Sequence, residues 1–499
     1  MEKMELYSNL SEIFGSENVT VTYEDLLAYE GDDNRLRKLQ VYFPKYREKF
    51  LADAAVIATD REQIVKLVNF ANEHKTPLIP RAGGTSLHGQ LIPIKGGVIV
   101  DTTRMDRIKE INTRARYAVV EPGVLYRELN DDLEKRGYWF PCAPGSERSC
   151  RIGGMVGNNA SGTRACKYGT TKDFVLGLEV VLPTGEVVRL GGKSLKSSSG
   201  INLKDLFVGS EGTLGIITEV TLRIDPKPEF EMSAVVGFRA TEDACNAAME
   251  VIGRGLIPAS MELVGPAVIP ALNFVLPEEL KMPDRRDGVE ANLIIRTDAT
   301  DEPTARAEME RIVEVCKGFN ALRVKEYDLE QSIHLWRMRD ECTATGGRAT
   351  RPPPEHFMIG GDVIGDIGVP LDRILEFVQG AEKICRKYRF MLSYVGHIGD
   401  GNLHLGFGYR RPDKRWALNE ARCERELIEF AVSLGGTVSA EHGAGLWMAH
   451  LLPIEHGPAL GLMRRIKRLL DPNNIMNPGK MNLDFLPEIV DPENWFREG

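Results

Sequence analysis

Two histidines stand seven residues apart in the stretch GHIGDGNLHLGF, which covers residues 396 to 407. The glycine, aspartate and asparagine between them favour a tight turn, so we expect a β-hairpin in which His397 and His404 face the same side. Glu441, in the stretch TVSAEHGAG after another expected strand, supplies a carboxylate. Two imidazoles and one carboxylate leave a divalent ion with open positions for substrate oxygens, which is typical of catalytic sites. A competing interpretation, in which both histidines cap the hairpin through hydrogen bonds, fits the spacing equally well.

His442 directly follows Glu441. Neighbours on an extended backbone point in opposite directions, so we expect only one of the two to bind the ion. His442 is then available as a base, and the ordinary pKa of histidine suits proton abstraction near neutrality. A nearby metal ion makes a substrate hydroxyl easier to ionise. The pair therefore predicts a division between metal binding and proton transfer.

Glycine and small polar residues are concentrated in three stretches, 80–89, 144–169 and 209–215. Glycine lets backbone N–H groups crowd around an anion such as a pyrophosphate. The first stretch has the glycine spacing of a P-loop, but Gln90 and Leu91 stand where that motif needs Lys and Ser or Thr. No strand-turn-helix context accompanies the GDG turn, which excludes a Rossmann fingerprint. Three such stretches in one region favour a large phosphate-bearing cofactor.

The elements expected around these stretches alternate between strands and helices from about residue 52. The segment REQIVKLVNFANEHK places its apolar residues on one helix face, which is typical of an α/β domain. The runs GLEVVL and EVVRLGG, joined by the turn-forming PTG, predict a β-hairpin. Two prolines in DPKPEF remove backbone donors and predict the end of a sheet, so we place a domain boundary near residue 226. Beyond it, two β-α-β segments of similar layout predict an antiparallel sheet with helices on one face.

Composition excludes several classes of protein. The chain has 499 residues, 42% of them hydrophobic, and a net charge of −9, which argues against disorder and against nucleic-acid binding. None of its apolar runs approaches the length that spans a bilayer, and the start has no cleavable leader, so we expect a cytoplasmic protein without a transmembrane segment. Its 8 cysteines include no CxxC motif and predict no iron-sulfur cluster within the chain.

Several motifs together resemble one family. PRAGGTSLHG, PGSERSCRIGGMVGNNASG, KYGTTKDFVLGLEVVLPTGE and VGSEGTLGIITEVTLRI resemble the FAD domain of the vanillyl-alcohol oxidase type. GHIGDGNLH, SAEHGAG and NPGKM resemble the branch that contains D-lactate dehydrogenase, the glycolate oxidase catalytic subunit and D-2-hydroxyglutarate dehydrogenase. The resemblance implies an α+β fold with three parts: a two-part α/β FAD-binding domain (1–226), a cap domain with the metal site and an antiparallel sheet covered by helices (227–450), and a C-terminal segment that returns to the FAD domain (451–499).

The resemblance also implies which residues bind FAD. The backbone of the first glycine stretch holds the pyrophosphate, and the later stretches and the tail line the rest of the cofactor. The expected residues are Pro80, Arg81, Ala82, Gly83, Gly84, Thr85, Ser86, Gly89, Pro144, Gly145, Ser146, Gly153, Gly154, Gly157, Asn158, Ser161, Gly162, Glu211, Gly212, Ile217, Asn477 and Lys480. Family members with covalent flavin carry a histidine directly after the glycine pair, where this chain has Thr85. We therefore expect non-covalent FAD and interpret His88 as a polar loop residue.

The remaining roles follow from the same resemblance. Arg339 and Thr343, four residues apart in WRMRDECTATGG, lie on one helix face and bind the substrate carboxylate, although a helical arginine by itself is usually a solvated surface residue. His442 is the base, and the C2 hydrogen of a 2-hydroxy acid leaves as hydride to the flavin. We expect His397, His404 and Glu441 to bind zinc, with manganese or iron as alternatives.

One departure from the family pattern bears on the substrate. Members that act on 2-hydroxyglutarate place a lysine where this chain has Gly360 and Gly361, so a second substrate carboxylate lacks that partner. Arg348 and Arg351, in the preceding insert, either compensate or belong to a rigid surface loop. We therefore expect a monocarboxylate of the D-lactate or glycolate type.

The electrons must leave the chain for another acceptor, because no cluster motif is present. Related systems use an iron-sulfur subunit, an electron-transfer flavoprotein or a quinone-linked chain. Two other functions stay open at this point. One is a non-redox, FAD-dependent transferase that resembles alkyl-dihydroxyacetonephosphate synthase, and the other is a metallohydrolase without flavin, for which the three glycine stretches would have no explanation.

Overall fold

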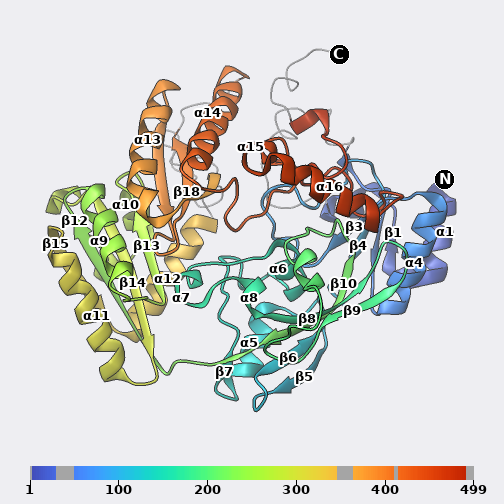
Figure 1. The fold of residues 1–499 in the computed structure, drawn as a ribbon, viewed down its shortest axis with the longest axis horizontal. Coiled ribbons are helices and arrows are strands. Elements are labelled where there is room, and N and C mark those ends of the chain that lie inside the picture. Colours follow the sequence, from blue (N-terminus) through green and yellow to red (C-terminus); the bar gives the residue numbers. More distant parts are fainter. Residues whose placement is uncertain (1–2, 30–49, 345–362, 409–413, 491–499) are drawn as a thin grey trace. The chain divides into compact units, whose positions relative to one another are not determined.

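The computed structural model describes residues 3–29, 50–344, 363–408 and 414–490. The chain forms two compact units (Figure 1). The described residues of the first unit are 3–29, 50–161, Thr170–Lys227 and 441–490. The second contains Gly162–Gly169 and Pro228–Ala440. One unit with a mixed sheet and a second with a large antiparallel sheet confirm the α+β fold class expected from the sequence.

The first unit contains a four-stranded sheet, a five-stranded sheet and a short strand pair. The four-stranded sheet has the order β1-β2-β4-β3, in which β2 and β3 run parallel to β4 and β1 is antiparallel to β2. The five-stranded sheet, β5-β6-β10-β8-β9, is antiparallel throughout. The strands are β1 (Val19–Thr20), β2 (Ala54–Ile57), β3 (Leu78–Arg81), β4 (Val98–Asp101), β5 (Ile108–Asn112), β6 (Tyr117–Val120), β7 (Tyr138–Trp139), β8 (Val175–Val181), β9 (Val187–Gly191), β10 (Ile216–Arg223) and β11 (Asp225–Pro226).

The helices of the first unit are short except for α1, α4 and α16. They are α1 (Lys3–Phe14), α2 (Tyr23–Leu26), α4 (Arg61–His74), α5 (Tyr126–Glu134), α6 (Ile152–Asn158), α8 (Thr171–Phe174), α15 (Leu452–His456) and α16 (Pro458–Leu470). Helix α4 begins after Asp60, whose carboxylate accepts a hydrogen bond from the N–H of Gln63 (2.9 Å), and it ends at Lys75, which has a φ of 52°.

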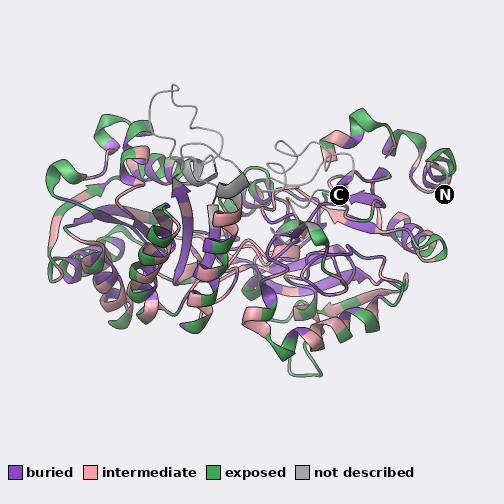
Figure 2. Ribbon diagram, turned by 90° about the horizontal axis from the view of Figure 1, so that it is seen from above, coloured by how far each residue is buried: buried purple, intermediate pink, exposed green. Residues whose placement is uncertain are grey.

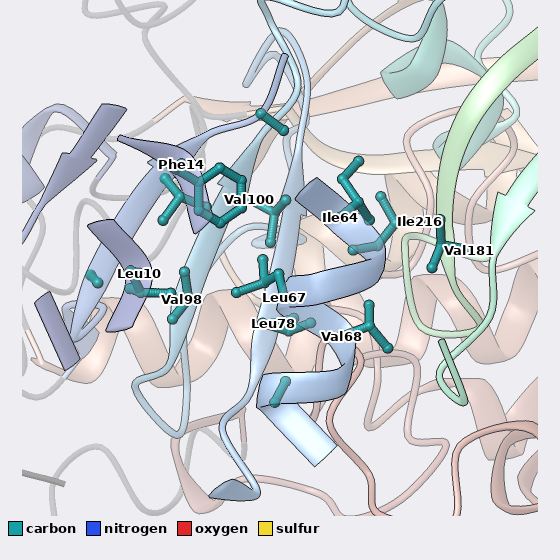
Figure 3. Packing of buried hydrophobic residues seen from close by; sticks show 14 of the residues in the cluster. Leu10, Phe14, Ile64, Leu67, Val68, Leu78, Val98, Val100, Val181 and Ile216 are labelled. Carbon is teal, nitrogen blue, oxygen red and sulfur yellow. The ribbon is translucent and has the colours of Figure 1, made fainter. Parts of the chain in front are cut away.

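The core of the four-stranded sheet lies between the strands and helices α1 and α4 (Figure 3). The apolar residues of α4 recur at helical spacing and face the strands, as the sequence pattern predicts. Residues of this core include Leu10, Phe14, Ile64, Leu67, Val68, Leu78, Val98, Val100, Val181 and Ile216. This packing holds β3 and β4 side by side and so positions the glycine stretch that follows β3.

Two local predictions can be checked in this unit. The hairpin joined by PTG is confirmed, because β8 and β9 are antiparallel with Val181 opposite Val187. The prolines of DPKPEF do not end all pairing, however. Strand β10 stops at Arg223, but Asp225 and Pro226 pair with β7 in a separate two-stranded sheet, where Pro226 occupies a position that tolerates the loss of its N–H group.

The second unit is built on a seven-stranded antiparallel sheet in the order β15-β12-β14-β13-β17-β18-β16. Its strands are β12 (Phe230–Phe238), β13 (Ser260–Val264), β14 (Ala291–Ala299), β15 (Ala321–Tyr327), β16 (Val363–Gly368), β17 (Met391–Gly396) and β18 (Asn402–Gly408). Its helices are α7 (Ala165–Tyr168), α9 (Thr241–Gly253), α10 (Ile269–Val275), α11 (Glu302–Lys317), α12 (Leu329–Ala344), α13 (Ile374–Lys387) and α14 (Lys414–Ser433).

Helices cover this sheet on both faces, so the expectation of helices on one face is wrong. Strands of the large sheet are coloured as buried in Figure 2, and residues 291 to 298 of β14 are all buried. Because successive strand residues point to opposite faces, both faces of β14 are covered. Helices α9 and α11 pack on β12 and β14. Leu272 of α10 and Trp336 of α12 belong to a separate buried cluster with Val235 and Ile294 of the sheet. Helix α12 thus contributes to the second covered face of the sheet, and its residue Arg339 is buried in the unit.

Candidate active site

The first glycine stretch leaves the carboxyl end of β3, beside the parallel strand β4. The carbonyl of Arg81 accepts a hydrogen bond from the N–H of Thr102 (2.9 Å), which holds the start of the stretch on the sheet. Gly84 has a φ of 68°, in the left-handed region that favours glycine. A Cβ added at Gly83 would lie 2.7 Å from the carbonyl oxygen of Ser149. The first stretch therefore packs directly against the second.

The glycines of the second stretch are of two kinds. At Gly153 an added Cβ would lie 2.5 Å from the Cβ of Pro122, so close packing requires glycine there. At Gly145 and Gly157 no heavy atom lies within 4 Å of an added Cβ. Protein packing thus accounts for Gly153 and leaves Gly145 and Gly157 as bare backbone next to open space. Bare backbone allows a ligand to approach closely, so these residues fit an FAD cradle.

The tail reaches the same region through buried side chains. Nδ2 of Asn477 donates hydrogen bonds to the carbonyls of Glu211 (2.7 Å) and Gln90 (3.0 Å). Nζ of Lys480 donates to the carbonyl of Ile92 (2.6 Å). The tail therefore joins the end of the first stretch to the third.

Most of the expected FAD-binding residues thus lie together in the first unit. Gly212 packs against Pro80, and Ile217 lies half-buried in β10. Gly162 is the exception, because it belongs to the second unit with the short segment Gly162–Gly169. Ser161, the last residue before that segment, stays in the first unit.

Glu211, in the third glycine stretch, has a buried carboxyl group. Burial raises its pKa to about 7, against the opposing effect of hydrogen bonds from backbone N–H groups. Those N–H groups belong to Ala444 (2.7 Å) and Gly445 (2.9 Å), in the loop that follows His442. Glu211 therefore links the third glycine stretch to the loop that carries the candidate base.

The raised pKa of Glu211 makes a testable contribution to stability. The folded protein holds this proton more tightly than the unfolded chain, so the contribution is complete below pH 4.5 and is lost as pH rises to about 7. The loss amounts to about 3 kcal/mol. We expect Glu211→Gln to remove this pH dependence, so that the wild type loses unfolding free energy relative to the variant between pH 4.5 and 7. Urea unfolding across this range measures the difference, and a difference that stays constant with pH would contradict the assignment.

Glu441 and His442 lie in the first unit, close to the second glycine stretch. Oγ of Ser161 donates to Oε2 of Glu441 (2.9 Å). The carbonyl of His442 accepts hydrogen bonds from Nδ2 of Asn158 (3.3 Å) and from Nε2 of Gln90 (2.8 Å). Three residues of the cradle region therefore hold the Glu441–His442 pair.

The two neighbours do not point in opposite directions as the sequence suggested. Nε2 of His442 lies 3.5 Å from Oε1 of Glu441, because the chain bends at these residues instead of continuing as a strand. The argument that alternation separates the two side chains is therefore wrong. The distinction between ligand and base must come from their surroundings.

His397 and His404 lie in the second unit and meet as expected from the hairpin. Strands β17 and β18 are antiparallel, with Val395 opposite His404, and His397 follows the end of β17. Their Nε2 atoms are 3.4 Å apart and their rings are nearly perpendicular, at 89°. Two nitrogens that bind one tetrahedral ion at about 2.0–2.1 Å lie roughly 3.3–3.4 Å apart. The observed separation fits a shared metal ion.

Glu262 of β13 determines the tautomer of His397. Its Oε1 lies 2.5 Å from Nδ1 of His397. A carboxylate accepts, so Nδ1 carries the proton and Nε2 keeps its lone pair for a metal. Glu262 also accepts a hydrogen bond from Nη2 of Arg339. Burial alone would raise the pKa of Glu262, but the charge of Arg339 and the hydrogen bond with His397 hold it below its usual value.

Arg339 is buried in the second unit instead of lying on the surface. It belongs to a group of buried polar residues that we call the polar cluster: Glu262, Arg339, Asp366, His397 and His404. Nη2 of Arg339 lies 3.4 Å from Nδ1 of His397. Thr343 belongs to the same helix, but its side chain lies outside the described residues, as do Arg348, Arg351 and the glycines at 360 and 361.

Two buried carboxylates of this cluster escaped the sequence analysis. Glu262 and Asp366 each interrupt an otherwise apolar strand, in SMELV and VIGDIG, and such an interruption was the available signal. Asp366 accepts hydrogen bonds from Nδ2 of Asn402 (2.8 Å) and Oγ of Ser439 (2.8 Å), and its Oδ1 lies 3.8 Å from Nδ1 of His404. Each histidine of the pair thus has a carboxylate near its Nδ1 atom.

Comparisons with known proteins agree with this geometry. Residues 52–191 match the family model described as an FAD binding domain, and residues 227–481 match the C-terminal domain of FAD linked oxidases. Glycolate oxidase subunit GlcD of Bacillus subtilis is 31% identical over 453 residues, which cover 90% of this chain and 93% of that protein. The mitochondrial D-lactate dehydrogenase [cytochrome] of Arabidopsis thaliana is 32% identical over 479 residues, which cover 96% of this chain and 80% of that protein. A structure of p-cresol methylhydroxylase with bound substrate superposes with a TM-score of 0.75 at 20% identity, over 96% of this chain and 97% of that one.

The chain belongs to the FAD-linked oxidases of the vanillyl-alcohol oxidase type. Within that family it is an FAD-linked oxidoreductase related to D-lactate dehydrogenases and glycolate oxidase. None of the helices in the described part of the chain combines the length and apolar character needed to cross a membrane.

Proposed function

We propose that this protein oxidises a 2-hydroxy monocarboxylate, of the D-lactate or glycolate type, to the 2-oxo acid with FAD and a divalent metal ion. The observation that carries the proposal is the 3.4 Å separation of the Nε2 atoms of His397 and His404 in a chain of this family. The names of the relatives, glycolate oxidase and D-lactate dehydrogenase, support the substrate class.

The metal ligands in this proposal are His397, His404 and Glu441, with zinc as the first choice and manganese or iron as alternatives. Chain connectivity supports Glu441 as the third ligand. The N–H of Ala440, one residue earlier, donates to the carbonyl of Asp366 (2.9 Å), and Asp366 is opposite His404 in the pairing of β16 with β18. Imidazole and carboxylate ligands of this kind suit a catalytic ion with open positions.

The chemistry divides among the residues as follows. FAD held by the glycine stretches would supply a hydride acceptor for the C2 hydrogen, and a metal ion held by His397, His404 and Glu441 would supply positive charge beside the substrate oxygen. His442 removes the hydroxyl proton. Arg339 and Thr343 hold the substrate carboxylate, and Glu262 keeps His397 in the tautomer that binds metal. The hydroxy acid loses one hydride and one proton, and the product is the 2-oxo acid.

The two electrons removed from each hydroxy acid must then reach another acceptor. Cysteine spacing predicts no cluster within this chain, so we propose a separate iron-sulfur protein or electron-transfer flavoprotein as the acceptor. The name of one relative, D-lactate dehydrogenase [cytochrome], supports a separate protein as the electron acceptor.

Anaerobic titration of the purified holoprotein tests the proposal. D-lactate, glycolate, D-2-hydroxyglutarate and the L-enantiomers are added in turn, before and after chelation, while the visible flavin band is recorded. We expect D-lactate or glycolate to bleach the band, chelation to abolish bleaching, and a divalent ion to restore it. A flavin band that none of these acids bleaches would overturn the substrate assignment.

Removing the charge of Glu262 tests the metal site from outside the ligand set. Glu262→Gln leaves a neutral amide beside Nδ1 of His397, and because an amide can donate as well as accept, it favours the metal-binding tautomer less strongly than a carboxylate does. Second-shell carboxylates of this kind contribute about 10- to 100-fold to metal affinity, so we expect a loss of that size in a competition assay with a chelator. Glu310→Gln, an exposed change on α11 of the same unit, is the matched control. Equal metal affinity in both variants would show that Glu262 does not orient a ligand.

A further inference from the structure

His88, in the first glycine stretch, and Gln90, just after it, contact the loop that contains His442. The carbonyl of His88 accepts hydrogen bonds from the N–H groups of Leu446 (2.9 Å) and Trp447 (3.0 Å). Nδ1 of His88 lies 2.5 Å from the carbonyl oxygen of Gly443. His88 is therefore bonded to this loop at three points through both its main chain and its ring.

Gln90 completes the contact. Its Oε1 accepts a hydrogen bond from the N–H of His88 (3.0 Å), and its Nε2 donates to the carbonyl of His442 (2.8 Å). Both side chains are buried, with 6% of His88 and 2% of Gln90 exposed. We call His88 and Gln90 the clamp.

The chemistry of the acceptor decides the protonation of the His88 ring. A carbonyl oxygen only accepts, so Nδ1 of His88 carries a proton and donates it to Gly443. The His88 ring lies edge-on to the His442 ring, with centroids 5.5 Å apart and planes at 77°. Gln90 thus binds the main chain of His442, and the ring of His88 contacts the ring of His442.

The clamp also explains two glycines of the HGAG motif. Gly443 and Gly445 have φ values of 77° and 52°. An added Cβ at Gly445 would lie 2.2 Å from the carbonyl oxygen of His88, and one at Gly443 would lie 2.9 Å from Nε2 of Gln90. The loop can approach the clamp this closely only without side chains at these two positions.

We propose that His88 and Gln90 are positioning residues for His442, which couple the FAD pyrophosphate loop to the base. The inference rests on the proposed function, in which His442 removes the substrate proton. A base misplaced by about 1 Å can cost 10²-fold in rate, so the loss of a bond that fixes its loop should be visible in the chemical step. The ring of His88, interpreted from sequence as a polar loop residue, then has a specific task.

The test compares His88→Leu with His88→Asn. Leucine removes the donor, whereas the Nδ2 amide of asparagine stands near the place of Nδ1 and can still donate to Gly443. We expect His88→Leu to slow anaerobic flavin reduction by D-lactate or glycolate about 10- to 100-fold, with the flavin absorbance and the apparent Kd of the acid kept within about threefold. His88→Asn should restore most of the rate. His74→Leu, at an exposed histidine of α4, is the matched control and should match the wild type.

Amide hydrogen exchange of the peptide that covers residues 441–450 provides a readout independent of turnover. We expect faster exchange in His88→Leu and near-normal exchange in His88→Asn. If no acid reduces the wild-type flavin, the proposed function fails and hydrogen exchange alone decides whether the clamp exists. If His88→Leu does not fold, Gln90→Met, which removes the donor to His442, carries the same prediction.

Wild-type rates and wild-type exchange in His88→Leu, or in Gln90→Met where it replaces that variant, would overturn the clamp. A His88→Asn protein with normal flavin absorbance and Tm but no recovery of rate or exchange would overturn the assignment of the Nδ1 donor.

Discussion

Replacing His442 with alanine is expected to slow reduction of the flavin by D-lactate or glycolate by about 10³-fold, within the range that a positioned general base contributes. The cause is loss of the group that takes the hydroxyl proton as the C2 hydrogen leaves. The FAD spectrum should be unchanged, because the main-chain carbonyl of His442, which accepts from Asn158 and Gln90, is still present. Anaerobic stopped-flow spectroscopy measures the rate directly.

His456→Ala is the control for this experiment, since His456 lies on α15 of the same unit and has no place in the proposed site. Near-normal flavin reduction in His442→Ala would sink the assignment of the base. Loss of bound flavin in that variant would instead make His442 a residue of the cofactor site.

The second large effect is expected at the metal site. His404→Ala removes one of the two imidazoles whose Nε2 atoms are 3.4 Å apart. We expect the purified variant to contain much less than one metal ion per chain and to reduce its flavin at least about 100-fold more slowly. Chelation of the wild type should reproduce the loss, and added zinc or manganese should rescue the wild type but not the variant. Metal analysis and anaerobic flavin reduction measure the two effects.

This variant also separates the two interpretations of the histidine pair. If the histidines only cap the hairpin, His404→Ala should lower Tm, and any change in activity should occur without a matching change in metal content. His334→Ala, at an exposed histidine of α12 in the same unit, should change none of these quantities. A full complement of metal in active His404→Ala protein would rule out His404 as a ligand.

The polar cluster of the second unit has a clear physical logic. Glu262 and Arg339 are both buried, and a buried charge is tolerated only when it is paired and hydrogen-bonded. Their ion pair orients His397, so one interaction serves both stability and the site. A substrate carboxylate that binds Arg339 would meet a guanidinium already held in place by Glu262.

Local patterns predicted much of the fold because they depend on neighbours in the chain. The hairpins at PTG and at GDGN follow from turn residues between apolar runs, and both are present. The meeting of His397 and His404 follows from the same hairpin geometry. Helix α4 follows from its apolar periodicity and the capping residue Asp60.

Other features could not be predicted because they depend on residues distant in sequence. Glu262 is 135 positions from His397, and nothing near either residue indicates that they form a pair. At the bend of Glu441 and His442, the carbonyl of His442 accepts hydrogen bonds from the side chains of Asn158 and Gln90 instead of from a neighbouring strand. The alternation of side chains along a strand therefore does not apply there. Coverage of both faces of the large sheet depends on where α10 and α12 pack, which strand periodicity does not determine.

The sequence by itself determined the family, with its FAD-binding domain, and the residue types that could bind a metal, because glycine stretches, turns and histidine spacing act over short distances along the chain. Only the tertiary structure decided which side chains orient them. Glu262 and Arg339 behind His397, and His88 and Gln90 beside His442, act through contacts between segments that only folding brings together. Hydrogen bonds need partners within about 3 Å, and at these positions the partners come from other strands and loops.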